Sequence, residues 1–210
     1  MISPYNLKGL LIIISGPSGA GKGTVIKSLC GSNSRINILP SVTTRSPRIG
    51  EKEGQSYFFR TRDEFMEMIK HNKLIEWVEY CGNFYGTPKE QLESSLEEGF
   101  DVILEKEVIG ALKIKEAYPE SVTIFIAPPS LEELKRRIEG RGTESPDVIE
   151  RRLDRAVEEL EYIKNYDYVV VNENVDETAN AIKCIITAEK FKTSRNSDIL
   201  EKIKFHKAKS

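Results

Sequence analysis

The sequence predicts an α/β protein built on a doubly wound parallel sheet. Short apolar runs alternate with amphipathic helical patterns along the chain, as in proteins made of βαβ units. The first run, Leu10–Ser15, is continuously apolar and leads into a glycine-rich turn. Continuous runs are typical of strands that helices cover on both faces. With 210 residues, 39% of them hydrophobic, the chain can bury a core, which excludes a fully disordered or fibrous protein.

Four apolar runs predict the strands of this sheet. Leu10–Ser15 is followed by Val102–Leu104, Val122–Ala127 and Tyr168–Val171. A helix is expected from about Lys22, directly after the glycine-rich turn, and helical patterns separate the later runs.

Two further helices are expected between the third and fourth strands. Ser130 and Glu133 have the spacing of a capping box. Ser145 and Pro146 match an N-cap followed by a first-turn proline, and an amphipathic stripe continues from there to Ile163.

Residues 40–88 have a different pattern. Short alternating segments such as Tyr57–Phe59 and Leu74–Tyr80 flank a helical stretch around Phe65, and glycines mark several turns. We therefore expect a small, largely antiparallel insert in the α/β core.

The remaining segments are a candidate lid and a tail. Arg141 lies between two glycines in an irregular stretch, which suggests a short mobile lid over about residues 139–147. Residues 189–210 carry seven Lys and Arg against three Asp and Glu, and we expect this basic tail to be poorly ordered. The predicted main domain is 1–188, with its core at 1–39 and 89–188.

Charge and composition narrow the function classes. A formal net charge of −2 gives no global electrostatic case for nucleic acid binding. The apolar run Leu10–Ile14 is far shorter than a membrane span, and no signal-peptide pattern opens the chain, so a cytoplasmic protein is expected. Three widely separated cysteines (Cys30, Cys81 and Cys184) are expected to be reduced and packed.

The turn after the first strand has the composition of a phosphate-binding loop. Its glycines let successive backbone N–H groups turn toward a phosphate, and Lys22 can reach the β- and γ-phosphates at the helix N-terminus. The general motif has Ser or Thr after the lysine to hold Mg²⁺, whereas this chain has Gly23 and then Thr24. The alternative is a glycine-rich turn with a surface lysine. The expected ATP-binding residues here are Gly16, Pro17, Ser18, Gly19, Ala20, Gly21, Lys22, Gly23 and Thr24.

A second candidate anion site follows at residues 43–48. Arg45 and Arg48 are three residues apart beside hydroxyl side chains and a proline, and guanidinium groups suit bidentate contact with phosphate oxygens. Tyr57 and Tyr85 could add phenolic donors. The alternative is that both arginines are ordinary surface charges.

Together these motifs resemble the guanylate kinases, a group of nucleoside monophosphate kinases. Motifs in matching order and spacing cover about residues 8–188. They are Gly16–Thr24, Thr43–Glu51, Gly54 with Tyr57, Ile75–Trp77, Gly82–Gly86, Ile126–Ser130 and Glu139–Thr143.

The resemblance implies transfer of the γ-phosphoryl group of ATP to GMP, with Mg²⁺ bound together with ATP. It also implies a role in GMP recycling and guanine nucleotide supply, and a lid that carries arginines. The expected partners are the small molecules ATP and GMP, without nucleic acid or membrane.

Residue by residue, the resemblance implies a GMP site in two parts. The phosphate is expected among Ser41, Arg45, Arg48, Tyr57 and Tyr85, and the guanine at Glu76, Thr87 and Glu107.

The chemistry of guanine supports Glu76 as a base reader. Guanine presents adjacent N1–H and N2 amino donors, and an ionised carboxylate only accepts, whereas adenine has an acceptor at N1. Two structural alternatives stay open. Glu76 could be the solvent-facing member of an alternating strand, and Thr87 could cap a helix through a box with Glu90.

The resemblance also places positive charge on the transferring phosphoryl group, from Arg137, Arg141 and Arg152 together with Lys22. Arg137 and Arg141 could instead be solvated charges paired with glutamates. Asn172 is placed near the adenine by the same resemblance.

The strand Val102–Glu107 departs from the family pattern. Glu105 is expected near Mg²⁺ through water and, with Thr24, is a candidate metal residue. Lys106 and Ile109 occupy positions where an apolar and a polar residue are expected. Burying the Lys106 ammonium is costly without a partner, so we expect either a pairing acid or a strand end open to water.

Two rival functions stay open at this point. One is an enzyme of the same architecture that phosphorylates another small phosphorylated acceptor, against which Glu76 and Thr87 argue. The other is a non-catalytic module that binds phosphorylated peptides through Arg45 and Arg48, against which Lys22 argues.

Overall fold

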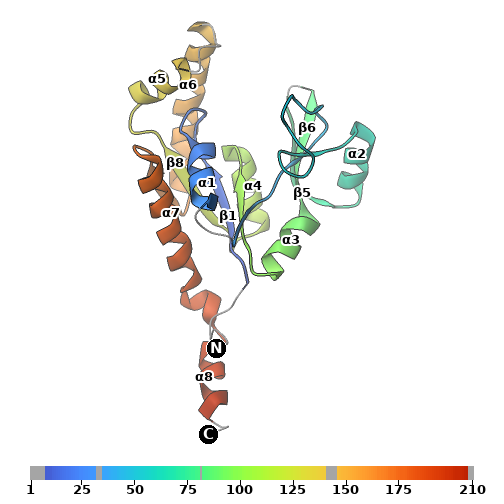
Figure 1. Ribbon diagram of the computed structural model, residues 1–210, viewed down its shortest axis with the longest axis vertical. Coiled ribbons are helices and arrows are strands. Elements are labelled where there is room, and N and C mark those ends of the chain that lie inside the picture. Colours follow the sequence, from blue (N-terminus) through green and yellow to red (C-terminus); the bar gives the residue numbers. More distant parts are fainter. Residues whose placement is uncertain (1–7, 32–34, 81, 141–145, 208–210) are drawn as a thin grey trace.

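The structure of the protein is a computed structural model that describes residues 8–31, 35–80, 82–140 and 146–207 (Figure 1). Within these residues, no helix is long and apolar enough to cross a membrane.

The central sheet has five parallel strands in the order β2-β7-β1-β8-β9. Their bounds are β2 Ile36–Ile38, β7 Asp101–Glu105, β1 Leu11–Ser15, β8 Val122–Ala127 and β9 Tyr168–Val171. The four predicted runs are therefore strands. The short edge strand β2 was not predicted from the sequence.

Side chains of β1 alternate between two cores, which explains its continuously apolar sequence. Ile12 and Ile14 pack with α1 (Lys22–Gly31) and α7 (Val175–Lys190) on one face of the sheet. Leu11 and Ile13 pack on the other face, against α3 (Lys89–Glu97) and α4 (Val108–Ala117). Helices on both faces confirm the doubly wound architecture.

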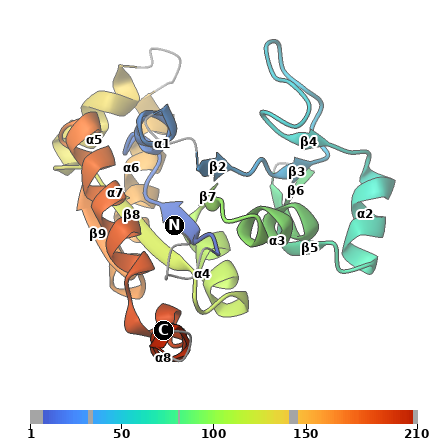
Figure 2. The same ribbon diagram turned by 60° about the horizontal axis from the view of Figure 1, so that its bottom comes forward.

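A second sheet projects to one side of the central sheet (Figures 1 and 2). Its order is β4-β3-β6-β5, and it is mixed: β3 pairs with β4 in parallel, and β6 is antiparallel to both β3 and β5. The bounds are β3 Val42–Thr43, β4 Phe58–Phe59, β5 Leu74–Tyr80 and β6 Asn83–Pro88.

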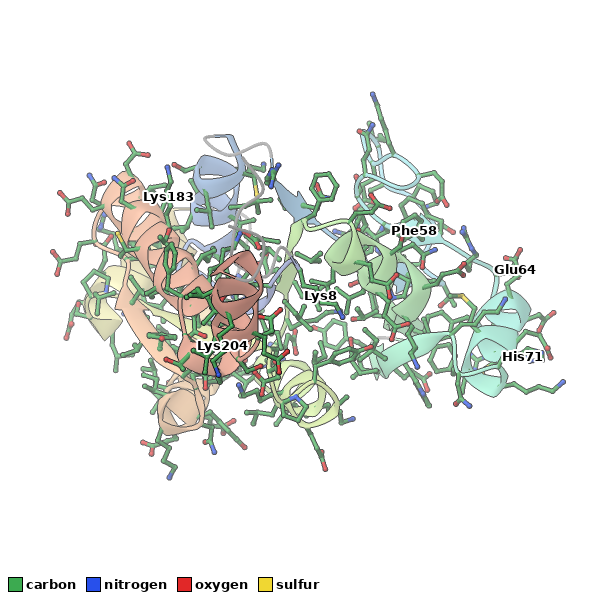
Figure 3. All side chains as sticks on the ribbon, turned by 90° about the horizontal axis from the view of Figure 1, so that it is seen from below. Lys8, Phe58, Glu64, His71, Lys183 and Lys204 are labelled. Carbon is green, nitrogen blue, oxygen red and sulfur yellow. The ribbon has the colours of Figure 1, made fainter. Side chains whose placement is uncertain are left out.

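Helix α2 (Arg62–Lys70) covers this second sheet with the fully buried Phe65, which stacks on Phe84. Thr61 and Glu64 form a complete capping box at its start. The helix ends at His71, whose side chain is exposed. Figure 3 shows Glu64 and His71 at the opposite end of the molecule from Lys183 on α7.

Helices α5 (Leu131–Glu139) and α6 (Pro146–Leu160) pack on each other through Leu134, Ile138 and Ala156, and the 3₁₀ helix η1 (Glu161–Asn165) continues α6. At the start of α5 the Ser130 hydroxyl accepts a hydrogen bond from the backbone N–H of Glu133. The Glu133 carboxylate does not complete the predicted capping box but pairs with Arg136 and Arg137. Residues 141–145, including Ser145 and most of the expected lid, lie outside the described residues.

The predicted poor order of the tail is wrong for its first part. Buried Glu189 contacts Tyr168, Lys192 and Arg195, and Asn196 is buried in the 3₁₀ helix η2 (Thr193–Asn196). Helix α8 (Ile199–Lys207) follows (Figure 1). Cys184 is exposed rather than packed, Cys30 is half-buried, and Cys81 lies outside the described residues.

Candidate active site

The loop between β1 and α1 has the backbone of a phosphate cradle. Gly16, Gly19 and Gly21 all have positive φ. At Gly16 a Cβ would lie 2.1 Å from the Ile126 carbonyl oxygen, so a side chain there would collide with β8. Glycine at this position therefore follows from the close approach of two strands as well as from backbone conformation.

Lys22 folds over this loop. Its Nζ donates to the carbonyl oxygens of Gly16, at 2.6 Å, and Pro17, at 3.2 Å. The ammonium is thereby held at the loop, where the predicted phosphates would lie.

Asn172 supports the loop from beneath. It is 3% exposed, and its Nδ2 donates to the Ala20 carbonyl at 2.7 Å while its Oδ1 accepts from Thr178 Oγ1 at 3.1 Å. A Cβ at Gly21 would lie 2.4 Å from Asn172 Nδ2. The amide points into the protein, so a contact with adenine would require it to exchange these partners.

A cleft of about 570 Å³ opens beside the loop. It brings together side chains from the phosphate-binding loop, the end of β7, the insert and α6. Its lining includes Ser18, Lys22, Ser41, Tyr57, Glu105, Lys106, Glu107, Arg152, Arg155 and Glu159.

The two candidate metal residues border this cleft or lie next to it. Glu105 ends β7, and its Oε2 would lie 3.9 Å from a Cβ placed on Gly23, directly before Thr24 on α1. The described residues contain no group of three His, Cys, Asp or Glu side chains that could hold a metal by themselves. A single carboxylate beside a phosphate-binding loop fits Mg²⁺, which is usually bound by one or two carboxylates together with substrate phosphates and water.

The second anion site contains an ion pair that sequence reasoning missed. Arg45 Nη2 lies 2.7 and 2.9 Å from the two carboxylate oxygens of Glu51, and the Arg48 backbone N–H donates to the same carboxylate at 2.8 Å. The hydrogen bond from Arg45 holds the pKa of Glu51 below its usual value. Glu51 is the last residue of the motif Thr43–Glu51, and this position was the one indication in the sequence that it belongs to the site.

Two tyrosines flank the Arg45 guanidinium. Its Cζ lies 5.3 Å from the centre of the Tyr57 ring, and Tyr85 packs edge-on against Tyr57. Arg45, Tyr57 and Tyr85 are thus brought together, as predicted for one site, while the Arg48 side chain is exposed.

Glu76 is buried, which excludes the alternative of a solvent-facing strand residue. Its Oε1 accepts from Thr87 Oγ1 at 2.6 Å, within β6. Thr87 does not cap α3, because the N-cap of that helix is Pro88. The side chain of Glu76 borders a groove along β5 rather than the main cleft.

Lys106 has a pairing acid, which is the first of the two alternatives expected from the sequence. Its Nζ lies 2.9 Å from Glu76 Oε1 and 3.0 Å from Ser41 Oγ, with only 11% of the lysine side chain exposed. Lys106 also borders the main cleft, so it lies between the cleft and Glu76.

Among the arginines expected near the transferring group, Arg137 and Arg152 lie within the described residues and Arg141 lies outside them. Arg137 donates to Glu133 at 2.7 Å and to the Asn172 carbonyl at 3.0 Å, and Arg152 borders the cleft. Hydrogen bonds from Arg136 and Arg137 lower the pKa of Glu133 to about 2. Arg137 therefore pairs with a glutamate, as the alternative interpretation of a solvated charge predicted. It also contacts Asn172, the residue that supports the phosphate-binding loop.

A phosphate-binding loop at the carboxyl ends of parallel strands, with a second arginine site on a neighbouring insert, defines a P-loop phosphotransferase. The family model described as guanylate kinase matches residues 8–189. The chain belongs to the guanylate kinase family and is an ATP-dependent nucleoside monophosphate kinase that phosphorylates GMP.

Similarity to individual proteins extends over nearly the whole chain. A guanylate kinase of Caldanaerobacter subterraneus subsp. tengcongensis is 50% identical over 94% of this chain and 96% of its own length. One from Bacillus anthracis is 54% identical over 90% of this chain and 92% of its own. The crystal structure of guanylate kinase from Anaplasma phagocytophilum superposes with a TM-score of 0.74, at 37% identity, over 95% of this chain and 97% of that one.

Proposed function

We propose that the cleft beside Lys22 binds both substrates, with ATP on Gly16–Thr24 and GMP on the insert. The observation that carries this proposal is the shared lining of the cleft: Lys22 from the phosphate-binding loop and Ser41 and Tyr57 from the insert border one space. Two phosphorylated substrates held in one cleft are the geometry that phosphoryl transfer needs. The proposed units are the core at 1–39 and 89–188, the GMP-binding insert at 40–88 and the lid at about 139–147.

In this scheme Lys22 leaves its loop carbonyls and holds the β- and γ-phosphates of ATP. Thr24 and Glu105 would hold Mg²⁺, with water between, and the metal supplies charge neutralisation for the phosphates when bound. Arg137, Arg141 and Arg152 add positive charge to the transferring group.

Arg45 is proposed to exchange Glu51 for the GMP phosphate, with Ser41, Arg48, Tyr57 and Tyr85 as further donors. The Tyr57 ring stays beside the guanidinium in this exchange and helps to hold it in place, so less conformational entropy is lost on binding. Glu76, Thr87 and Glu107 are proposed to contact guanine. The product GDP fits a role in guanine nucleotide supply, in the cytoplasm.

The test is a coupled ADP-release assay with ATP and Mg²⁺, and with GMP, AMP, CMP or UMP as acceptor. Rapid turnover with GMP alone is the expected result. Turnover with AMP at a comparable kcat/KM would overturn the assignment of the guanine-contacting residues. Bound ATP without turnover of any acceptor would overturn the assignment of the catalytic residues.

A further inference from the structure

We propose that Lys106 determines guanine specificity by donating a hydrogen bond to the O6 atom of the base. The proposal deepens the proposed function and rests on the assignment of guanine to Glu76. It starts from a residue that departs from the family pattern and that the reaction scheme above leaves without a role.

The position of the Lys106 ammonium is fixed by two contacts. Nζ is held by Glu76 Oε1 at 2.9 Å and by Ser41 Oγ at 3.0 Å, and both partners of the ion pair are nearly buried, with side chains 11% and 5% exposed. Ser41 leads into β3, Glu76 is on β5 and Lys106 follows β7, so the ammonium joins the insert to the core. A buried, paired ammonium does not swing freely into solvent.

The ammonium keeps one N–H for a ligand. Lysine has three donors: one is donated to Ser41 Oγ, and the ammonium also faces the Glu76 carboxylate in the ion pair, so at most two are used. Among the described residues Nζ has no third acceptor, and the side chain borders the cleft. The third N–H is therefore available to a ligand in the cleft.

The neighbouring groups match one edge of guanine. Guanine carries the N1–H donor next to the O6 acceptor, and Glu76 and Lys106 supply an acceptor and a donor side by side. Oε1 of Glu76 already faces Lys106 Nζ and Thr87 Oγ1, so the second carboxylate oxygen is the acceptor for N1–H. Adenine has an N6 amino donor in place of O6, which would face the ammonium without an acceptor. Thr87 does not supply this donor, because its one hydroxyl hydrogen is directed at Glu76 Oε1.

The experiment compares GMP with 6-thio-GMP, which keeps the N1–H and the N2 amino group but replaces O6 by the weaker acceptor sulfur. We expect Lys106→Met to lower kcat/KM for GMP at least tenfold and for 6-thio-GMP much less, so that the ratio between the two substrates shrinks. Lys106→Arg, which keeps a donor, should restore part of the ratio. Lys183→Met replaces an exposed lysine on α7; it is the matched control and should leave the ratio unchanged.

Other results would overturn the proposal. A merely structural Lys106 would lower kcat/KM for both substrates by the same factor, and a lysine that competes with guanine would give a lower KM for GMP when it is removed. Lys106→Met could fail to fold because it leaves the buried Glu76 carboxylate without a counter-ion. The comparison is then made between Glu76→Gln and the double variant Glu76→Gln, Lys106→Met, which has no unpaired buried charge at this position. The proposal then requires that the ratio still shrink in the double variant.

The wild-type enzyme separates this proposal from the proposed function. Absence of GMP preference in wild type would contradict the proposed function itself. GMP preference with an unchanged ratio in Lys106→Met contradicts only the role of Lys106.

Discussion

Arg155 on α6 and Glu107 at the start of α4 form an ion pair, with 2.7 Å between Nη2 and Oε2, and both residues border the cleft. Glu107 is a proposed guanine contact, so this pair connects α6, the helix after the proposed lid, to the proposed base site. Both side chains are more than half exposed. An exposed pair of this kind contributes about 0–1 kcal/mol, so a ligand can replace it at little cost.

Replacing Arg155 should therefore strengthen GMP binding slightly. We expect Arg155→Met to lower KM for GMP by up to about fivefold, which corresponds to about 1 kcal/mol, and to leave KM for ATP unchanged. Steady-state kinetics with each substrate varied in turn would check this. A rise in KM for ATP would show instead that Arg155 contacts the nucleotide.

Lys22 should be essential for turnover but not for folding. Its hydrogen bonds to carbonyl oxygens of its own loop contribute little to the packed core. Lys22→Ala should lower kcat by about 10²-fold or more, the size expected when one stabilising group is removed from a transferring charge. Normal activity in a variant with wild-type thermal unfolding would contradict the phosphate-binding assignment.

Replacing Arg45 should weaken the binding of GMP but not that of ATP. Removing a charge-assisted contact worth about 1.5–3 kcal/mol should raise KM for GMP about 10- to 100-fold in Arg45→Ala, with a much smaller change for ATP. Arg60→Ala is a suitable control, since Arg60 pairs with Glu53 on the same insert at 2.8 Å and has no proposed substrate contact. Equal rises in both KM values would mean that the second anion site has been misplaced.

Asn172 should act through the loop that it supports. In Asn172→Ala the Ala20 carbonyl loses its buried partner, whereas the Thr178 hydroxyl keeps the Asn174 carbonyl at 2.7 Å. An unsatisfied buried carbonyl should cost about 1–3 kcal/mol and lower Tm by ~5 °C. A loosened loop should also raise KM for ATP. Differential scanning calorimetry and ATP titration measure the two effects, and an unchanged Tm with a raised KM would favour direct contact with adenine.

The raised pKa values of two buried tyrosines predict that the protein loses stability at alkaline pH. Burial raises the pKa of Tyr118 and of Tyr166 from 10.0 to about 12, with the nearby Glu93 adding to the effect at Tyr118. Because the folded state favours the neutral phenol, its contribution is fully present below about pH 10 and is lost as the pH rises toward 12. Urea unfolding at pH 9 and pH 11 should show a smaller loss in Tyr118→Phe and Tyr166→Phe than in wild type. Equal losses in all three proteins would contradict the prediction.

Local patterns were sufficient for the central sheet and the phosphate-binding loop. A strand such as Val122–Ala127 is buried on both faces, so its whole sequence is apolar apart from Thr123 and its bounds follow directly. The loop is contiguous, and its glycines follow from backbone geometry over a few residues. Strand β2 has three residues at the sheet edge, of which only Ile36 is buried, and so leaves no comparable pattern.

Side-chain partners depended on the tertiary structure. Asn172 and Ala20 are separated by 152 residues and Arg155 and Glu107 by 48, and nothing local to either residue specifies such a partner. Lys106 is the clearest case. The sequence showed a charge where an apolar residue was expected, and the physical cost of burial required a partner, but only the docking of the insert against the core decided that the partner is Glu76.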